Sequence, residues 1–262
     1  MNFLPFKVRQ ALYYRFFNSW DCHQKHKTKF EKARLKFAGD PSFEMFELVV
    51  GDVISGNIAF NGFYELKLSH YLSKIAKNGG LLVDVGANMG YFSLLWLSHN
   101  PNNRTIAIEA SPHVAKKLKN NVIKNKLGTR AKVFEIAAGK ENGTVSFDVA
   151  SEEQTGWGGI AKVASSATID VPMKKIDSFV DEQIDFLKID IEGADTWAIQ
   201  GCENLLKNKK IKIICFEENR PRMRELGISE GEGVEYIKQF GYRVEPFVTD
   251  NGKPVEWIAY LS

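Results

Sequence analysis

The chemistry of this 262-residue sequence is most visible in one glycine-containing segment, VDVGANMGYFS (residues 83–93), and in one acidic residue that follows it. The segment joins a short apolar run to a helical pattern. Gly86 can turn the backbone tightly and bring it close to a ligand, and Gly90 can allow close packing of a helix on a strand. Glu109 ends the next apolar run, where an acidic side chain can accept hydrogen bonds from both hydroxyl groups of a ribose. Together these residues predict a nucleoside-binding site.

The glycine segment alone is also compatible with a plain turn between a strand and a helix. The phosphate-binding pattern GxxxxGK[ST] does not occur in the sequence, which disfavours a nucleoside triphosphate. A dinucleotide site requires G-x-G-x-x-G, and Asn88 stands where the second glycine would let pyrophosphate approach the backbone. The pattern therefore favours an adenosine ligand without a pyrophosphate. A nicotinamide-dependent oxidoreductase remains the alternative.

Strand and helix patterns alternate around these residues. We expect strands over 81–86, 105–110, 131–137, 186–191 and 211–218, and helices over 66–77, 91–99, 112–125 and 194–208. Residues 144–150 alternate in polarity and predict an antiparallel excursion. Residues 242–247 and 254–261, on either side of an Asp-Asn-Gly turn, predict a closing hairpin. This order is typical of an α/β fold with a mainly parallel sheet and helices on both faces.

The N-terminal 37 residues are strongly basic. They contain nine Lys or Arg against Asp21 and Glu31, so their net charge is +7 and that of the remaining chain is −4. One interpretation is a solvated helical extension whose aromatic residues, such as Phe16, Phe17 and Trp20, pack on the main domain or on a second subunit of a homo-oligomer. The other is a basic amphipathic element that makes a peripheral contact with an anionic membrane or nucleic acid. Because no known nucleic-acid motif is present, we expect no nucleic-acid partner.

Residues 43–60 predict short strands and turns, because turn-forming residues occur at 51–52 and 55–57. We therefore divide the chain into a basic and aromatic extension over residues 1–60 and a main domain over residues 61–262.

The composition places the chain among globular proteins and favours the cytoplasm. Hydrophobic residues make up 44% and charged residues 26%, which excludes a wholly disordered or fibrous chain. The three cysteines are widely spaced and form no CxxC pattern, which argues against a disulfide framework and a thiolate zinc site. No apolar run approaches the length of a membrane span, and the first residues lack the apolar core of a signal peptide.

Three sequence blocks together resemble a known family. VDVGANMGYFS, IEASP (residues 108–112) and LKIDIEG (residues 187–193) are similar to the FkbM-type S-adenosylmethionine-dependent methyltransferases. The similarity extends roughly over residues 60–218 and includes GFYE (residues 62–65), which resembles the family's segment before the first strand. The resemblance implies a class I methyltransferase fold, Rossmann-like, with a seven-stranded mainly parallel sheet and an antiparallel C-terminal hairpin. It also implies S-adenosyl-L-methionine as the cofactor.

The same resemblance implies which residues surround the cofactor. Those around its methionine part would be Asp84, Gly86, Asn88 and Gly90. Glu109 would bind the ribose, and Ile136 and Ala137 would flank the adenine. The further cofactor contacts that we expect are Glu65, Tyr91, Phe92, Ser93, Ala110 and Asp190.

Carboxylates at the ends of two further strands are candidates for the reaction itself. Lys188, Asp190 and Glu192 share one side of their strand, which is either a polar face in water or a set of charges reaching a ligand cleft. Asp190 is the first catalytic candidate, because it could bind the cofactor's ammonium, steer an acceptor hydroxyl or take its proton. Glu217 and Glu218 end the next strand, and only one of them can face the cleft. Comparison with the family favours Glu217 as the second catalytic residue.

The predicted acceptor contacts are Trp157, Glu192 and Glu218. Trp157 belongs to the polar, glycine-rich segment 151–166, which is either an exposed connection or a mobile lid over the cofactor or a sugar ring. The clustered carboxylates could gather ligands for Mg²⁺, but no spacing enforces this, and the five histidines form no metal pattern. We therefore predict no metal.

The resemblance implies methyl transfer to a hydroxyl group, because many FkbM-type enzymes methylate sugars, glycolipids or secondary metabolites. The expected partner is thus a small-molecule or carbohydrate-like acceptor. The alternatives are N-methyl transfer, a lipid-linked acceptor at a membrane face, an NAD(P)-dependent oxidoreductase, and a non-catalytic cofactor-binding domain.

Overall fold

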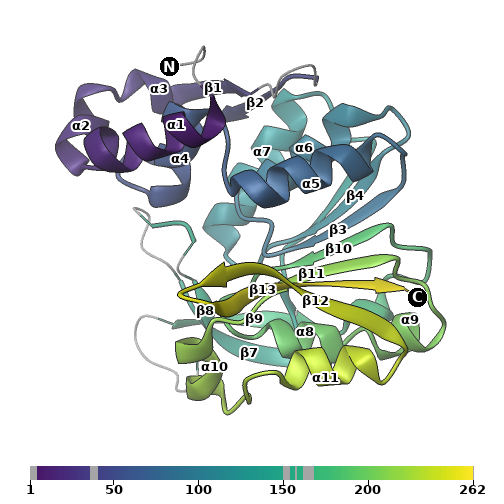
Figure 1. The fold of residues 1–262 in the computed structure, drawn as a ribbon. Coiled ribbons are helices and arrows are strands. Elements are labelled where there is room, and N and C mark those ends of the chain that lie inside the picture. Colours follow the sequence, from purple (N-terminus) through teal and green to yellow (C-terminus); the bar gives the residue numbers. More distant parts are fainter. Residues whose placement is uncertain (1–4, 36–40, 150–153, 157, 162–167, 262) are drawn as a thin grey trace.

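A seven-stranded sheet forms the centre of the computed structural model, which describes residues 5–35, 41–149, 154–156, 158–161 and 168–261 (Figure 1). The strand order is β12-β13-β11-β10-β3-β4-β5. The five strands from β11 to β5 are parallel, and β13 is antiparallel to both of its neighbours. The strands are β3 (Leu81–Val85), β4 (Arg104–Ile108), β5 (Ala131–Phe134), β10 (Phe186–Ile189), β11 (Ile213–Glu217), β12 (Tyr242–Asp250) and β13 (Lys253–Leu261). This order confirms the predicted class I methyltransferase fold and its C-terminal hairpin.

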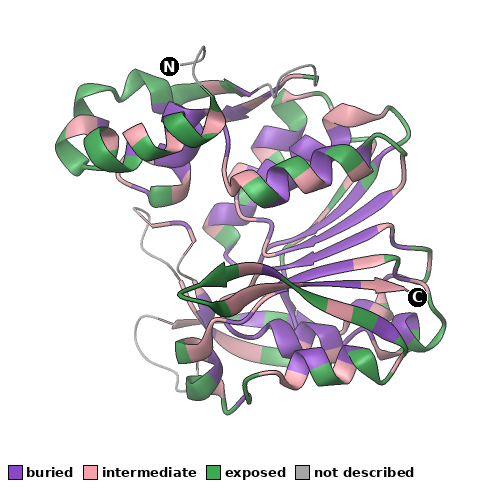
Figure 2. Ribbon diagram, viewed as in Figure 1, coloured by how far each residue is buried: buried purple, intermediate pink, exposed green. Residues whose placement is uncertain are grey.

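Helices cover both faces of the sheet, as Figure 1 shows. One face packs on α5 (Leu66–Ala76), α6 (Tyr91–His99) and α7 (Pro112–Lys124). The other packs on α8 (Asp195–Gln200), α9 (Glu203–Lys207) and α11 (Glu232–Lys238). Because side chains alternate along a strand, Leu81, Val83 and Val85 of β3 belong to the second core, whereas Leu82 belongs to the first. The buried sheet at the centre is visible in Figure 2.

The N-terminal region builds a helical layer on the first core. It consists of α1 (Phe6–Leu12), a π-helix (Tyr13–Phe17), α2 (Trp20–Lys25), α3 (Thr28–Glu31), the antiparallel pair β1 (Lys32–Leu35) and β2 (Phe43–Phe46), and α4 (Val53–Asn61). Tyr13, Phe30 and Phe60 are buried between these elements and belong to the first core. The layer is fastened to α7, because Asn121 accepts a hydrogen bond from the backbone N–H of Phe46 at 2.7 Å.

A second, four-stranded sheet has the order β6-β9-β7-β8. Its strands are β6 (Ala137–Ala138), β7 (Gly143–Asp148), β8 (Gly159–Ile160) and β9 (Thr168–Lys174). β7 pairs antiparallel with β8 and β9, which confirms the predicted antiparallel excursion.

The local predictions were wrong in three places. Residues 53–61, expected as strands and turns, form α4, because Asp52 caps the helix by accepting the N–H of Ser55 at 2.7 Å. The helix expected over 194–208 is interrupted at Gly201. A Cβ at Gly201 would lie 2.3 Å from the backbone oxygen of Gly139, so the chain passes close to the second sheet there. The strand expected over 131–137 ends at Phe134, and Ala137 pairs with β9 in the second sheet instead. The prediction missed β1, β8, β9, a 3-10 turn (Ile176–Ser178), α10 (Arg220–Leu226) and α11.

Within the described ranges, no helix combines the length and the apolar character needed to cross a membrane.

Candidate active site

A cavity of about 410 Å³ opens at the carboxyl ends of β3, β4, β10 and β11, where parallel α/β sheets bind ligands. Its other walls come from α4, the start of α5 and the second sheet. The predicted site residues that line it are Glu65, Gly86, Asn88, Tyr91, Phe92, Glu109, Ala110, Ile136, Ala137, Asp190, Glu192 and Glu217. Those that do not line it are Asp84, Gly90, Ser93 and Glu218. Trp157 lies outside the described residues.

The loop after β3 depends on glycine at two close approaches. A Cβ at Gly86, whose φ is +73°, would lie 1.9 Å from the backbone oxygen of Asp190, so only glycine fits between the two strand ends. At Gly90, whose φ is +92°, a Cβ would lie 2.6 Å from the side chain of Leu118 on α7. The second glycine therefore allows a helix to pack on a helix, rather than on a strand as predicted.

Glu109 is fixed at the end of β4 by two backbone amides. The N–H of Asn88 donates to Oε2 and the N–H of Ser111 donates to Oε1, both at 2.9 Å. Burial raises the pKa of Glu109 to about 7, although the two N–H groups oppose the shift. Ile136 and Ala137 supply a buried apolar wall to the same pocket.

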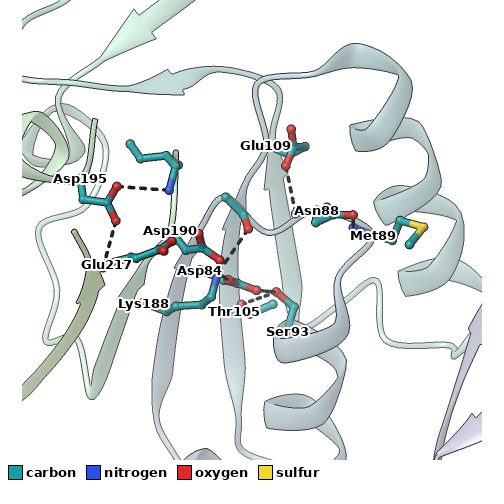
Figure 3. Close-up of polar contacts among 12 residues, drawn as sticks. Asp84, Asn88, Met89, Ser93, Thr105, Glu109, Lys188, Asp190, Asp195 and Glu217 are labelled. Atoms are coloured by element: carbon teal, nitrogen blue, oxygen red, sulfur yellow. Dashed lines mark hydrogen bonds and ion pairs between the residues drawn. The ribbon is translucent and has the colours of Figure 1, made fainter. Parts of the chain in front are cut away.

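A buried lysine underlies the pocket between β3 and β10 (Figure 3). The Lys188 ammonium lies 3.2 Å from Oδ2 of Asp190 and 3.8 Å from Oδ1 of Asp84. The strand register explains this, because Lys188 is the direct partner of Asp84 across the β10–β3 pair. Ser93 donates a hydrogen bond to Asp84 at 2.7 Å. Asp84 and Ser93 thus reach the pocket only through Lys188.

Four carboxylates gather beside this lysine. Glu217 on β11 is directly opposite Glu256 on β13, while Asp190 follows β10 and Glu65 precedes α5. Like charges in direct opposition are destabilising, and burial adds to the cost. Burial and the negative charge of Asp190 raise the pKa of Glu217 to about 10, of Glu65 to about 8 and of Glu256 to about 7.

Glu217 and Asp190 interact directly at the place where the parallel strands end. Asp190 also accepts a hydrogen bond from the Lys188 ammonium at 3.2 Å. The negative charge of Asp190 disfavours ionisation of Glu217 beside it. A carboxyl group in this position can exchange a proton with a bound ligand.

The neighbouring Glu218 has a structural position instead. Its carboxylate accepts hydrogen bonds from the backbone N–H of Gly231 at 2.7 Å and from the indole of Trp257 at 3.0 Å. Successive strand residues face opposite ways, so the side chain of Glu217 lines the pocket and that of Glu218 does not. Glu192 does line the pocket, where Asn219 donates to it at 2.8 Å.

Two predicted aromatic residues form the wall beneath α5. The hydroxyl of Tyr91 is hydrogen-bonded to the hydroxyl of Ser69 at 2.9 Å, and the Phe92 ring centroid lies 5.2 Å from the Lys188 ammonium. Both are buried, so they give the lysine an apolar surrounding on this side.

Several pocket residues were missed by the sequence analysis. Glu256 is the acidic residue in the apolar run 254–261, and its charge was the available signal. Ile54 and Ile58 reach the pocket from α4, which the sequence did not predict as a helix. Asp52 links α4 to the segment around Thr155 on the opposite side of the pocket, because its Oδ1 accepts the N–H of Thr155 at 3.0 Å.

No group of three or more His, Cys, Asp or Glu side chains in the described part of the chain is arranged to hold a metal ion.

This fold and pocket define an α/β domain with a nucleoside-type site at its strand ends. The sequence matches the family model of the methyltransferase FkbM domain over residues 84–244, more than half of the chain. The chain therefore belongs to the FkbM methyltransferase family. Membership of this family makes S-adenosyl-L-methionine its cofactor.

Comparison with curated proteins gives no significant match. Among solved structures, the FkbM methyltransferase from Methylobacillus flagellatus KT aligns with a TM-score of 0.49 and 14% identity, covering 82% of this chain and 56% of that one. The chain thus spans little more than half of that protein's length. A caffeoyl-CoA O-methyltransferase from Staphylococcus aureus, described as putative, has a TM-score of 0.48 and 12% identity, with 76% and 85% covered. An O-methyltransferase from Bacillus cereus in complex with SAH has a TM-score of 0.42 and 14% identity, with 76% and 83% covered.

The residues present fit this cofactor. Asp190 and Glu65 offer carboxyl oxygens to its sulfonium and ammonium groups, and the positive charge of these groups favours the ionised form of both acids. Glu109 presents a carboxylate for the ribose hydroxyls, and the tight turn at Gly86 leaves space beside the strand ends. Ile136, which is buried, offers an apolar contact for the adenine.

Proposed function

We propose that this protein transfers a methyl group to a hydroxyl group of a sugar, a glycolipid or a secondary metabolite. The observation that carries the proposal is the pair of carboxyl groups of Asp190 and Glu217, which both line the pocket at the ends of neighbouring strands. S-adenosylmethionine, when bound, supplies the activated methyl group. A hydroxyl acceptor has to lose its proton, and a well-placed carboxylate accelerates such a step by about 10²–10⁴-fold.

The two carboxylates have different parts in this proposal. Burial and the negative charge of Asp190 raise the pKa of Glu217 in the free pocket, and a positive charge that enters the pocket lowers this pKa again. Glu217 then loses its proton to solvent and, as a carboxylate, accepts the proton of the acceptor hydroxyl. Asp190 stays paired with Lys188 and orients the acceptor hydroxyl.

The composition of the pocket supports a carbohydrate-like acceptor. Carboxylates such as Glu192 and Glu256 can accept hydrogen bonds from several hydroxyl groups. Phe147, Ile160 and Ile54 add apolar surface to the opposite walls, which suits the non-polar face of a sugar ring.

Calorimetry with S-adenosylhomocysteine and transfer assays test the proposal in two steps. Methyl-labelled S-adenosylmethionine is offered with a panel of hydroxyl-bearing sugars and glycolipids, and in parallel with a panel of amines. We expect labelling in the hydroxyl panel and its loss in Glu217→Gln. Labelling of amines alone would replace the proposal with N-methyl transfer.

Three further expectations remain proposals about the whole protein. We keep the division into residues 1–60 and 61–262, although α4 from the first part lines the pocket of the second.

All three cysteines are free thiols, which supports a reducing cytoplasmic location. Homo-oligomerisation is a separate proposal that sedimentation analysis can test.

A further inference from the structure

The N-terminal helices expose an unusual set of large apolar side chains. Among the described residues, those exposed are Val8, Tyr14, Phe16, Trp20, Val53 and Ile123. Five of these six belong to the N-terminal layer, and Phe16 and Trp20 expose 59% and 51% of their surface. The exposed character of these helices is visible in Figure 2. Clustered exposure of this kind marks an interaction site rather than ordinary surface.

Two of the exposed aromatic side chains pack against the segment 51–57, which borders the pocket. The Trp20 ring lies against Gly51, where a Cβ would come within 2.4 Å of it. The Tyr14 hydroxyl lies 3.5 Å from the side-chain nitrogen of Asn57, which donates to the backbone oxygen of Val53. Val53 is itself exposed and lines the pocket. Val53 therefore connects the aromatic surface with the pocket.

Positive charge surrounds the same surface. Within residues 5–31, the exposed lysines and arginines that make no ion pair to a described residue are Lys7, Arg15, Lys25, Lys27 and Lys29. Arg15 lies over the Phe16 ring, with 5.3 Å between the guanidinium carbon and the centroid. Aromatic side chains among basic residues are the composition that binds an anionic lipid interface. A second copy of this chain fits less well, because a two-fold contact would bring one basic surface against another.

We propose that this surface, formed by Val8, Tyr14, Phe16, Trp20 and Val53 with the cations around them, docks the protein on an anionic lipid bilayer. The aromatic side chains enter the interface and the lysines and arginines face the lipid phosphates. Docking in this way places the pocket entrance beside the membrane. The inference goes beyond the proposed function and is measured without turnover, so either can fail without the other.

Co-sedimentation of the full chain with vesicles tests the docking. The vesicles contain phosphatidylcholine alone or phosphatidylcholine with phosphatidylglycerol. We expect binding to the anionic vesicles that is at least about tenfold stronger than to the neutral ones, since each basic residue near an anionic surface favours binding by about fivefold. Equal binding to both, or binding to neither, would overturn the proposal.

Matched variants separate the aromatic contribution from the charge. Phe16→Ser with Trp20→Ser should weaken vesicle binding about tenfold. Separately, Lys7→Glu with Arg15→Glu should weaken it at least about 25-fold, since each of the two basic residues favours binding by about fivefold. The controls are Ile123→Ser, an apolar residue on α7 that is 67% exposed, and Lys74→Glu with Lys116→Glu, two exposed lysines outside this surface; both should bind as the parent does. Thermal unfolding checks that each variant folds, and Phe16→Ser alone is used if the Trp20 change destabilises the contact with Gly51.

Three results would assign the surface to something else. Equal losses in the controls would show non-specific adsorption. Loss in the charge variant but not in the aromatic variant would show simple attraction of a basic tail to any polyanion. A dimer in sedimentation equilibrium that Phe16→Ser dissociates would show that a second copy occupies the surface.

Discussion

The pocket and the N-terminal surface differ in the sign and the burial of their charges. In the pocket, Asp190, Glu217, Glu256 and Glu65 crowd around the single buried Lys188, and burial raises the pKa of the last three glutamates. On the N-terminal surface, the cations point into solvent and have no acidic partner among the described residues. Burial disfavours the charged form of these acids, whereas the surface cations are solvated by water. The first region is suited to chemistry on a cation-bearing ligand and the second to long-range attraction.

The largest expected effect comes from the pair of adjacent glutamates that end β11. Glu217→Gln removes the proposed base, and we expect turnover of the acceptor to fall by about 10²–10⁴-fold. S-adenosylhomocysteine affinity should change much less. Glu218→Gln is the matched control, since its side chain faces Gly231 and Trp257 outside the pocket. Equal losses of turnover in the two variants would contradict the assignment of Glu217 as the base.

Glu109→Ala should have the next largest effect, on cofactor binding. The change removes the proposed ribose acceptor and leaves the N–H groups of Asn88 and Ser111 without their partner. We expect the calorimetric Kd for S-adenosylhomocysteine to rise by about 10–100-fold. Glu135→Ala, an exposed glutamate paired with Lys119, serves as the control and should leave the Kd unchanged. Unaltered binding by Glu109→Ala would contradict the assignment.

The buried acids should make the stability of the free protein depend on pH. Burial raises the pKa of Glu109 to about 7 and of Glu65 to about 8, above the ordinary value of about 4.3. A raised pKa in the folded state contributes stability below the unfolded value, and that stability is lost as the pH rises through the folded value. The free energy of unfolding should therefore fall between about pH 5 and pH 8, as measured by urea unfolding. Glu65→Gln should flatten part of this slope. Stability that rises over the same window would contradict the burial of these groups as acids.

Two glycines with positive φ differ in the space that an added side chain would have. At Gly86 a Cβ would meet the backbone of Asp190, whereas at Gly252, with a φ of +78°, nothing lies within 4 Å. Gly252→Ala should cost only backbone strain of about 1–2 kcal/mol. Gly86→Ala should cost clearly more, because a strand end must also move. Thermal unfolding of both variants measures the difference. Equal losses in the free energy of unfolding would mean that the strand ends at the pocket move apart with little loss of stability.

Salt should produce the smallest effect in the pocket and a large one at the surface. Exposed charges are screened at high ionic strength and buried charges much less. Between about 0.05 M and 0.5 M salt, we expect the S-adenosylhomocysteine Kd to change by less than about threefold and anionic vesicle binding to weaken by more than about tenfold. Similar salt dependence in both assays would remove the contrast between the two regions.

The sequence predicted the parts of the site that follow from local patterns. The turn at Gly86 and the acid at Glu109 follow from strand-to-helix spacing, and the alternation of Lys188 and Asp190 predicted one shared side of β10. The choice of Glu217 over Glu218 rested on the family resemblance, and the structure places Glu217 in the pocket.

The missing parts depend on contacts between distant segments. Glu256 meets Glu217 only through the β11–β13 register, which no single segment encodes. Ser55, Gly56 and Asn57 have turn-forming character, yet burial against the N-terminal helices makes them part of α4. The aromatic surface could be proposed from composition, but its position beside the pocket required the packing of Trp20 on Gly51.

The central claim, a cofactor site built on Glu109 and the buried carboxylates, is tested most directly by calorimetric titration of the free protein with S-adenosylhomocysteine, with NAD as a parallel titrant. We predict micromolar binding of S-adenosylhomocysteine and none of NAD. Binding of NAD alone, or of neither compound, would contradict the account.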